Sequence, residues 1–324
     1  MKLNLNLFPS DDVAEWSTLL TESPQGSIFS DARYLQALAV PHTCYIARTP
    51  HGEPLAGVAV LENGEGMQVA PFPFTPYQGI FFGPLVVAQP SHKRVTSELR
   101  ITECIINSLV ERYGNCSMAL SPAFADIRPF LWHNYHALGV PRFRIENRYT
   151  AVLDLSDFHY ENYLKSIRAV RRQEVKKAAV ELSETDEVAL FIDIYAKTFE
   201  RQGIVVSPQQ LELVRSITAS AMENGFGRLA KAINGDGVAS MTLFVYDARC
   251  AYYLFGANNP AQRHTGASSA LMVDNIRAMA EIGMSRLDFV GINSPNRGDY
   301  KLSFNPDIVH YHEVHLVRGN QLDA

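Results

Sequence analysis

The sequence predicts an α+β protein made of two halves with similar architecture. Both halves show helical segments, then three short alternating segments typical of an antiparallel meander, then a long helix and a further strand. The 324 residues are enough for two domains, and no low-complexity linker separates the halves. We therefore expect domains over 1–148 and 149–324, each with a mixed, mostly antiparallel sheet flanked by helices.

In the first half, alternation predicts an opening strand over 2–7. Apolar periodicity then predicts helices over 11–20 and 27–38, with Ser10 and Ser30 as caps. The remaining expected elements are strands over 43–48, 55–63 and 67–72, a long amphipathic helix over 95–113, a strand over 117–122 and a short helix over 129–139. Residues 142–155 alternate again and contain the crossing between the halves.

The second half repeats this order. We expect helices over 160–178, 187–202 and 208–224, a meander over 227–233, 237–247 and 249–257, a long helix over 267–282, and strands over 286–291 and 308–317. The repetition is one of architecture, with little sequence identity between the halves.

Composition excludes several classes of protein. Hydrophobic residues make up 47% and charged residues 19%, which predicts a compact globular chain. The net charge of −5 argues against a general nucleic-acid coat, and we expect no DNA partner. The four cysteines form no CxxC pair, so we interpret them as reduced and structural. No apolar run approaches a membrane span, and we expect a cytoplasmic protein.

The stretch PFPFTPYQGIFFGP, residues 71–84, is the least ordinary part of the first half. Its prolines exclude a helix or a central strand, and it is too apolar for a solvated loop. One interpretation is that it lines an acceptor site in a cleft between the halves, with Tyr77 offering a hydroxyl and Phe74 and Phe81 offering ring faces. The alternative is a hydrophobic plug.

Several short pieces, taken in order, resemble one family. They are RYTAVLDL, YLKSIRAVRRQEVKKA, FERQG, AYYLFGANNP, ASSALMVDNIRAMAEIGMSRLDFVG and GDYKLSFNP in the second half, and PFPFTPYQGIFFGPL in the first. The chain resembles the GNAT-related acyltransferases, and more closely the FemABX-like double-GNAT branch. The resemblance implies two tandem GNAT-like domains and the transfer of an acyl group from acyl-CoA to an amine, or of an aminoacyl group from aminoacyl-tRNA.

Direct acyl transfer needs positioning and oxyanion stabilisation, so the lack of a convincing GxSxG elbow does not exclude it. In GDYKLSFNP, the FemABX-like motif puts its functional lysine at Lys301, beside Tyr300, and we expect both in the catalytic set. Asn305 and Pro306 stand where the motif usually has a glycine. Asp288 in RLDFVG is a candidate general base or orienter of the amine, or a structural anchor for the loop that follows.

A possible phosphate site lies in QRHTGASSA, residues 262–270, which leads into a helix. GNAT proteins hold the CoA pyrophosphate on a loop at this place, and backbone N–H groups with the helix dipole explain why an anion binds there. The candidate residues here are Arg263, Gly266, Ala267 and Ser268. The match is partial, and an ordinary helix cap is the alternative.

The second half contains two further clusters of polar side chains, one basic and one of histidines. On the expected basic helix, Lys165, Arg168 and Arg172 share a face and could grip phosphates of a nucleotide-linked acceptor or of tRNA; a solvated charged face is the alternative. His310, His312 and His315 lack metal-site spacing and have no nearby cysteine or carboxylate set, so we expect no metal.

The sequence thus favours an acyltransferase with acyl-CoA as donor and an amine acceptor, such as a sugar or peptide of a cell-envelope precursor. A tRNA donor is the alternative among enzymes. A non-catalytic binding protein with GNAT-like halves is the alternative outside enzymes.

Overall fold

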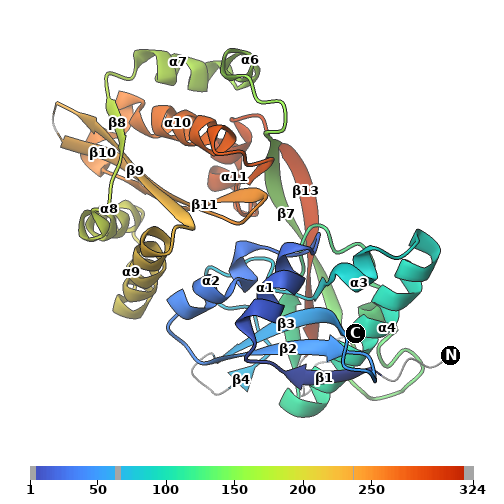
Figure 1. The fold of residues 1–324 in the computed structure, drawn as a ribbon. Helices are drawn as coiled ribbons and strands as arrows, with labels where there is room; N and C mark the ends of the chain where they lie inside the picture. The colour runs from blue at the N-terminus through green and yellow to red at the C-terminus, as the bar shows by residue number, and fades with distance from the viewer. Residues whose placement is uncertain (1–4, 63–66, 236, 317–324) are drawn as a thin grey trace. The chain divides into compact units, whose positions relative to one another are not determined.

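The computed structural model describes residues 5–62, 67–235 and 237–316. The chain divides into two compact units (Figure 1). Unit 1 comprises Met1–Gln36, Val40–Arg148 and His310–Ala324, and unit 2 comprises Ala37–Ala39 and Tyr149–Val309. One boundary thus falls between 148 and 149, but the C-terminal strand groups with unit 1 from His310 on. The expected limits, 149–324, had assigned that strand to the second domain.

Unit 1 is built on an antiparallel meander. Strands β1 (Asn6–Pro9), β2 (His42–Arg48) and β3 (Pro54–Glu62) pair in order, and β4 (Met67–Gln68) and β5 (Phe81–Phe82) both pair with β3. Strand β6 (Cys116–Ala119) pairs with the end of β13 (Asp307–Leu316). The helices of this unit are α1 (Val13–Thr21), η1 (Ile28–Ser30), α2 (Ala32–Ala37), α3 (Pro84–Val87), α4 (Ser91–Tyr113) and α5 (Arg128–Trp132).

The amphipathic helix α4 organises the core of unit 1. Its apolar face, which includes Ile101, Ile105 and Leu109, is buried against β1, β2 and β6. Val314 and Leu316 of β13 belong to the same buried cluster. The helix ends at Gly114, whose φ of 77° is the left-handed conformation favoured for glycine after a helix.

Unit 2 contains a longer sheet. Its strands are β7 (Arg144–Asp154), of which the part from Tyr149 on belongs to unit 2, then β12 (Arg286–Asp288), β11 (Cys250–Asn258), β10 (Gly237–Tyr246), β9 (Gly227–Asn234) and β8 (Glu181–Glu184), in that spatial order. Strands β11 and β12 pair in parallel because α10 (Ala267–Glu281) carries the chain back between them. The other pairs in this series are antiparallel.

The helices of unit 2 pack on this sheet. Helix α10 contacts β9 and β10, while α8 (Val188–Glu200) contacts β10 and β11 and α9 (Pro208–Glu223) contacts β9. Helix α7 (Ala169–Lys177) lies on the outer side of α10, next to α6 (Tyr160–Ser166) (Figure 1). The last helix, α11 (Pro295–Leu302), follows β12.

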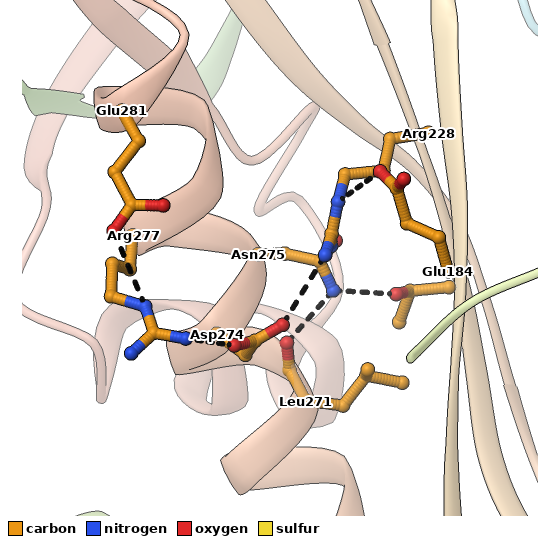
Figure 2. A network of polar contacts seen from close by, with 8 residues as sticks. Glu184, Arg228, Leu271, Asp274, Asn275, Arg277 and Glu281 are labelled. Atoms are coloured by element: carbon orange, nitrogen blue, oxygen red, sulfur yellow. Dashed lines mark hydrogen bonds and ion pairs between the residues drawn. The ribbon is translucent and has the colours of Figure 1, made fainter. Parts of the chain in front are cut away.

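A polar network fastens α10 to the sheet (Figure 2). Asn275 is fully buried, and its side-chain amide donates to Thr242 Oγ1 at 2.9 Å and to the Leu271 carbonyl at 2.8 Å. The Arg228 guanidinium of β9 donates to the Asn275 side-chain oxygen and pairs with Glu184 of β8 at 2.7 Å. The network therefore satisfies the buried polar groups where helix and sheet meet.

Several sequence expectations were wrong in detail. Asp12, not Ser10, caps α1, accepting hydrogen bonds from two backbone N–H groups. The helix expected over 27–38 is divided into η1 and α2 because Asp31 between them is extended. The helix expected over 129–139 ends at Trp132, and the strand expected over 67–72 covers only β4.

At the chain ends, part of the expected strand over 2–7 and residue 317 of the strand over 308–317 lie outside the described residues. No helix in the described part of the chain has the length and apolar character needed to cross a membrane.

Candidate functional site

Lys301 lies in the last turn of α11, with its side chain turned into unit 2. Its Nζ donates to the carbonyls of Val290 and Gly291, at 2.7 and 2.9 Å, and lies 5.7 Å from the centre of the Tyr253 ring. Burial lowers the pKa of Lys301 to about 8, Asp288 opposes this shift and Arg297 adds to it. The lysine is therefore a partly desolvated amine that loses its charge at a lower pH than an exposed lysine does.

The turn that receives Lys301 has an unusual backbone. Val290 and Gly291 both have positive φ, 53° and 70°, and a β-branched residue rarely adopts this conformation. Asp288 holds the turn, because its Oδ1 accepts from Thr150 Oγ1 at 2.5 Å and from the Val290 N–H at 2.7 Å. The Gly291 N–H donates to Thr150 Oγ1 at 3.1 Å. This arrangement directs two successive carbonyls at one ammonium group.

The positive φ values also explain why β12 ends at Asp288, although the expected strand ran over 286–291. Asp288 is 3% exposed, and its hydrogen bonds with Thr150 and Val290 hold the turn together. These contacts agree with the structural interpretation of Asp288. Its role toward an amine acceptor stays a prediction.

Tyr300, next to Lys301, connects α11 to the start of α10. Its hydroxyl donates to the Ser268 carbonyl at 3.3 Å, and the Arg171 guanidinium lies 5.0 Å from its ring centre. Burial raises the pKa of Tyr300 to about 12, and the Arg171 charge partly opposes this. The hydroxyl is therefore neutral at physiological pH and acts as a hydrogen-bonding group.

The predicted phosphate loop is the segment from η2 (Pro260–Thr265) into α10. Gly266 has a φ of 74° and precedes Ala267, the first residue of the helix, whose N–H donates to Thr265 Oγ1 at 3.3 Å. Ser268 follows in the first turn and is partly buried. Arg263 lies within η2, and the structure does not describe its side chain.

A carboxylate of α7 lies beside this helix start. Glu174 Oε2 accepts from Ser269 Oγ at 2.5 Å and pairs with Arg171 Nη1 at 2.5 Å. A Cβ atom on Gly266 would lie only 2.6 Å from the Glu174 carbonyl oxygen. Glycine is thus required because α7 packs directly on the loop, and the first turn of α10 already receives a negative group from within the chain.

The basic helix expected over 160–178 was wrong as a single helix. Ile167 is 1% exposed, and the chain extends at Ile167 and Arg168 to bury it, which separates α6 from α7. Arg172 donates to the freed carbonyls of Lys165 and Ile167, at 2.8 and 2.5 Å. Arg168 pairs with Asp299 at 2.6 Å. The shared face predicted from helical spacing does not form, and phosphate binding by Arg168 and Arg172 stays a prediction.

Comparison with known proteins agrees with this fold. Residues 161–302 match the family model described as an acetyltransferase (GNAT) domain. Among solved structures, FemX is similar over 96% of this chain and 97% of its own, with a TM-score of 0.69 and 12% identity.

A tandem GNAT protein from the clavulanic acid biosynthesis pathway is similar over 98% of this chain and 100% of its own, with a TM-score of 0.54 and 11% identity. The chain has a FemABX-like tandem GNAT fold.

The C-terminal domain of a protein described as a lysylphosphatidylglycerol synthetase from Agrobacterium fabrum is also similar, over 95% of this chain and 92% of its own, with a TM-score of 0.53 and 12% identity. A search of curated proteins found no match. The GNAT domain match supports an N-acyltransferase class of enzyme, and the structural likenesses establish the fold.

The proline-rich segment of the first GNAT-like half is largely internal to unit 1. Phe81 is 1% exposed and packs edge-on against Trp16 with ring centres 4.9 Å apart, which agrees with the plug interpretation for this residue. Tyr77 has a φ of 62° and packs edge-on against Tyr311. Phe74, with a φ of 63°, is only partly buried, and its carbonyl accepts from the Tyr34 hydroxyl at 2.5 Å. Their roles in acceptor binding stay predictions.

The histidines of β13 divide into two groups. The rings of His310 and His312 lie 5.5 Å apart. His315 lies near Glu146 and Glu313, and one ligand atom from each of these three lies within 4.8 Å of the others. The sequence analysis missed this group because Glu146 is distant in the chain. Arg144 and Arg148 pair with the two carboxylates, at 2.7 and 3.0 Å, and so balance their charge.

Sequence reasoning also missed the groups that surround Lys301 and Gly266. In the sequence, Thr150 is one residue of RYTAVLDL, in the strand expected to connect the halves. Glu174 is one acidic residue within a basic segment. Alternation and charge patterns carry no signal for such partners. The one local signal was Gly291, because a glycine at the end of the strand expected over 286–291 indicates an irregular backbone there.

Proposed function

We propose that this chain is an N-acyltransferase that moves an acyl group from a thioester or ester donor to an amine acceptor, with the chemistry in unit 2 around Lys301. The observation that carries the proposal is the placement of the Lys301 ammonium. Two of its three N–H donors bind the Val290 and Gly291 carbonyls, and no third partner is found among the described residues. We propose that the third donor binds the oxyanion of the reaction.

The transfer itself requires no covalent enzyme intermediate. A neutral amine attacks the donor carbonyl and a tetrahedral oxyanion forms. Its collapse expels the thiolate or alkoxide of the donor, which takes up the proton lost by the amine nitrogen. In the protonated form, Lys301 would stabilise this oxyanion in a site with little water, where a fixed charge is most effective. Asp288 would hold the turn and favour the charged lysine, and Tyr300 would fix α11 against α10.

Acyl-CoA is the donor that we propose first, and an aminosugar or a peptide amine of an envelope precursor is the acceptor. The donor phosphates would approach Gly266, Ala267 and Ser268 at the start of α10. This assignment rests on the GNAT match over 161–302 and on the position of the loop before that helix.

One observation favours the second candidate, an aminoacyl-tRNA donor. The Glu174 carboxylate and the backbone of α7 occupy space beside the first turn of α10. A diphosphate brought to the same place would compete with the Glu174 carboxylate for Ser269 and Arg171, which disfavours its binding. A donor whose phosphates bind elsewhere would not meet this obstacle.

Thermal unfolding of the whole chain separates these donors. We expect a ligand of the native state to raise stability by about 2.7 kcal/mol at 100 times its Kd. Acetyl-CoA, longer acyl-CoAs, free CoA and uncharged tRNA are compared. A shift with CoA species alone supports the first candidate. A shift with tRNA alone, unchanged in Glu174→Ala, supports the second.

Turnover tests the site itself. With the donor identified, Lys301→Ala is expected to reduce kcat by about 10²–10³-fold while the donor-induced thermal shift remains. Lys176→Ala, at an exposed lysine of α7 that does not line the Gly266 loop, is the matched control. A different outcome would indicate a binding protein. In that case the chain binds the donor but transfers no acyl group to any of a panel of aminosugars and peptides, and neither Lys301→Ala nor Asp288→Asn changes donor binding.

A further inference from the structure

The loop over residues 128–143 in unit 1 presents apolar side chains to solvent. Five of them lie within ten consecutive positions, and Leu138 is 93% exposed. The others, between 37% and 57% exposed, are Leu131, Trp132, Tyr135 and Val140. Single exposed apolar residues are ordinary, but such a group in one short segment marks an interaction surface.

Ring packing and hydrogen bonds within the loop fix its conformation. Its base is fastened by Phe130 and Phe143, which are buried and pack edge-on with ring centres 5.1 Å apart. Across the loop, Asn134 Nδ2 donates to the Pro141 carbonyl at 2.8 Å, and Arg142 Nη2 donates to the Tyr135 carbonyl at 2.7 Å. The apolar tip is therefore held outward by internal bonds.

The charged side chains within the loop are all basic. Residues 127–145 contain three arginines and two histidines and no acidic residue, although the whole chain has a net charge of −5. The Arg128 guanidinium lies 5.3 Å from the Trp132 ring, and the Arg142 guanidinium lies 5.7 Å from the Tyr135 ring. Asp126 and Glu146, just outside this range, pair with Arg128 and Arg144.

From these observations we infer that the 128–143 loop docks on an anionic lipid bilayer, with Leu138 inserted below the headgroups and Trp132 and Tyr135 at their level. Amphipathic aromatic rings favour this depth, and arginine stems bury their methylenes while the guanidinium groups remain at the lipid phosphates. A protein surface would provide the apolar contact, but the arginines beside the Trp132 and Tyr135 rings match the phosphates and the headgroup level of a bilayer. The inference does not depend on the proposed acyl transfer.

Vesicles test this inference directly. The whole chain is sedimented with vesicles of phosphatidylcholine, with and without about one third phosphatidylglycerol. We expect binding to the anionic vesicles, weakened by salt. Leu138→Ser should reduce the partition coefficient about tenfold through lost apolar burial. Arg144→Gln should reduce it about fivefold. Val205→Ser, at a 92% exposed valine of unit 2, is the matched control and should leave it unchanged.

Tryptophan fluorescence measures the binding of the loop to vesicles. The chain has two tryptophans, of which Trp16 is 2% exposed in the core and Trp132 is 50% exposed. Anionic vesicles should shift the emission of Trp132 to shorter wavelength, and Trp132→Phe should remove the shift.

Three results would overturn the inference: no sedimentation with anionic vesicles, equal binding by Leu138→Ser and the unaltered chain, or self-association that Leu138→Ser abolishes while vesicles bind neither protein. The last result would assign the loop to an interface between copies of this chain.

Discussion

At the scale of single residues, burial of the charged Lys301 side chain lowers the free energy of unfolding. In the folded protein its pKa is lowered to about 8 from an ordinary value of 10.5, chiefly by burial. Between these values the unfolded chain binds more protons than the folded one, so stability rises with pH through this window. Below about pH 8 both states carry the charge, and the folded state bears the full penalty.

This linkage predicts a pH-dependent effect of Lys301→Met. The difference in unfolding free energy, unaltered chain minus variant, should increase by about 2–3 kcal/mol between pH 7 and pH 10.5, because only the unaltered chain loses the penalty. Urea unfolding at several pH values measures it. Lys177→Met, an exposed lysine, provides the baseline. A difference that stays constant with pH would show that the Lys301 amine is not desolvated.

Val290 gives a second prediction at this scale. Val290→Gly removes a β-branched side chain from a φ of 53° and should raise or leave unchanged the free energy of unfolding, within about 1 kcal/mol. It should also loosen the two carbonyls that hold Lys301, so turnover should fall while stability does not. Urea unfolding and the transfer assay are compared on the same preparation. Loss of stability by more than about 2 kcal/mol would show that the turn is not strained.

At the scale of elements, helix α10 is held by the buried amide of Asn275. Replacing it by leucine removes both hydrogen bonds that it donates and leaves Thr242 Oγ1 and the Arg228 guanidinium with fewer partners (Figure 2). We expect Asn275→Leu to destabilise the chain by about 2–4 kcal/mol, measured by urea unfolding.

The same helix provides the control for this prediction. Arg277 pairs with Asp274 and Glu281 on the solvent side, and Arg277→Gln should change stability by no more than about 1 kcal/mol. Equal effects of Asn275→Leu and Arg277→Gln would contradict the buried network as the attachment of α10.

Elements also show what the sequence could predict. The meanders, the long helices α4 and α10 and the crossover before β12 were predicted from periodicity, because each buries a continuous apolar face. The break between α6 and α7 was not, because it depends on burial of Ile167 by residues distant in sequence. At the site, the order of motifs indicated Lys301 and Gly266, but the partners that fix them, Thr150 and Glu174, come from tertiary packing.

At the scale of the whole molecule, sequence order and structural grouping differ. His310–Ala324 groups with unit 1, where Val314 and Leu316 are buried and β13 pairs with β6. The two sequence halves indicated a boundary near residue 148. They could not show that the last strand joins unit 1, because the alternating pattern of a strand does not indicate its partner strands.

This grouping predicts which fragments fold. Residues 1–148 alone should fail to give a cooperative thermal transition, because β6 lacks its partner and part of the core is missing. Joining residues 310–316 to residue 148 by a short Gly-Ser linker should restore the transition. Circular dichroism on both fragments measures it. A cooperative transition of 1–148 without the added strand would show that β13 is dispensable to unit 1.

The late position of β13 has a consequence for synthesis. A ribosome releases the chain from the N-terminus, so all of unit 2 emerges before His310–Leu316 can reach β6. During that interval the nascent first unit presents an unpaired strand edge at Cys116–Ala119, whose side chains are all buried in the finished protein. Chaperones that recognise extended apolar segments should therefore engage this protein early, and release it only when translation has passed residue 316.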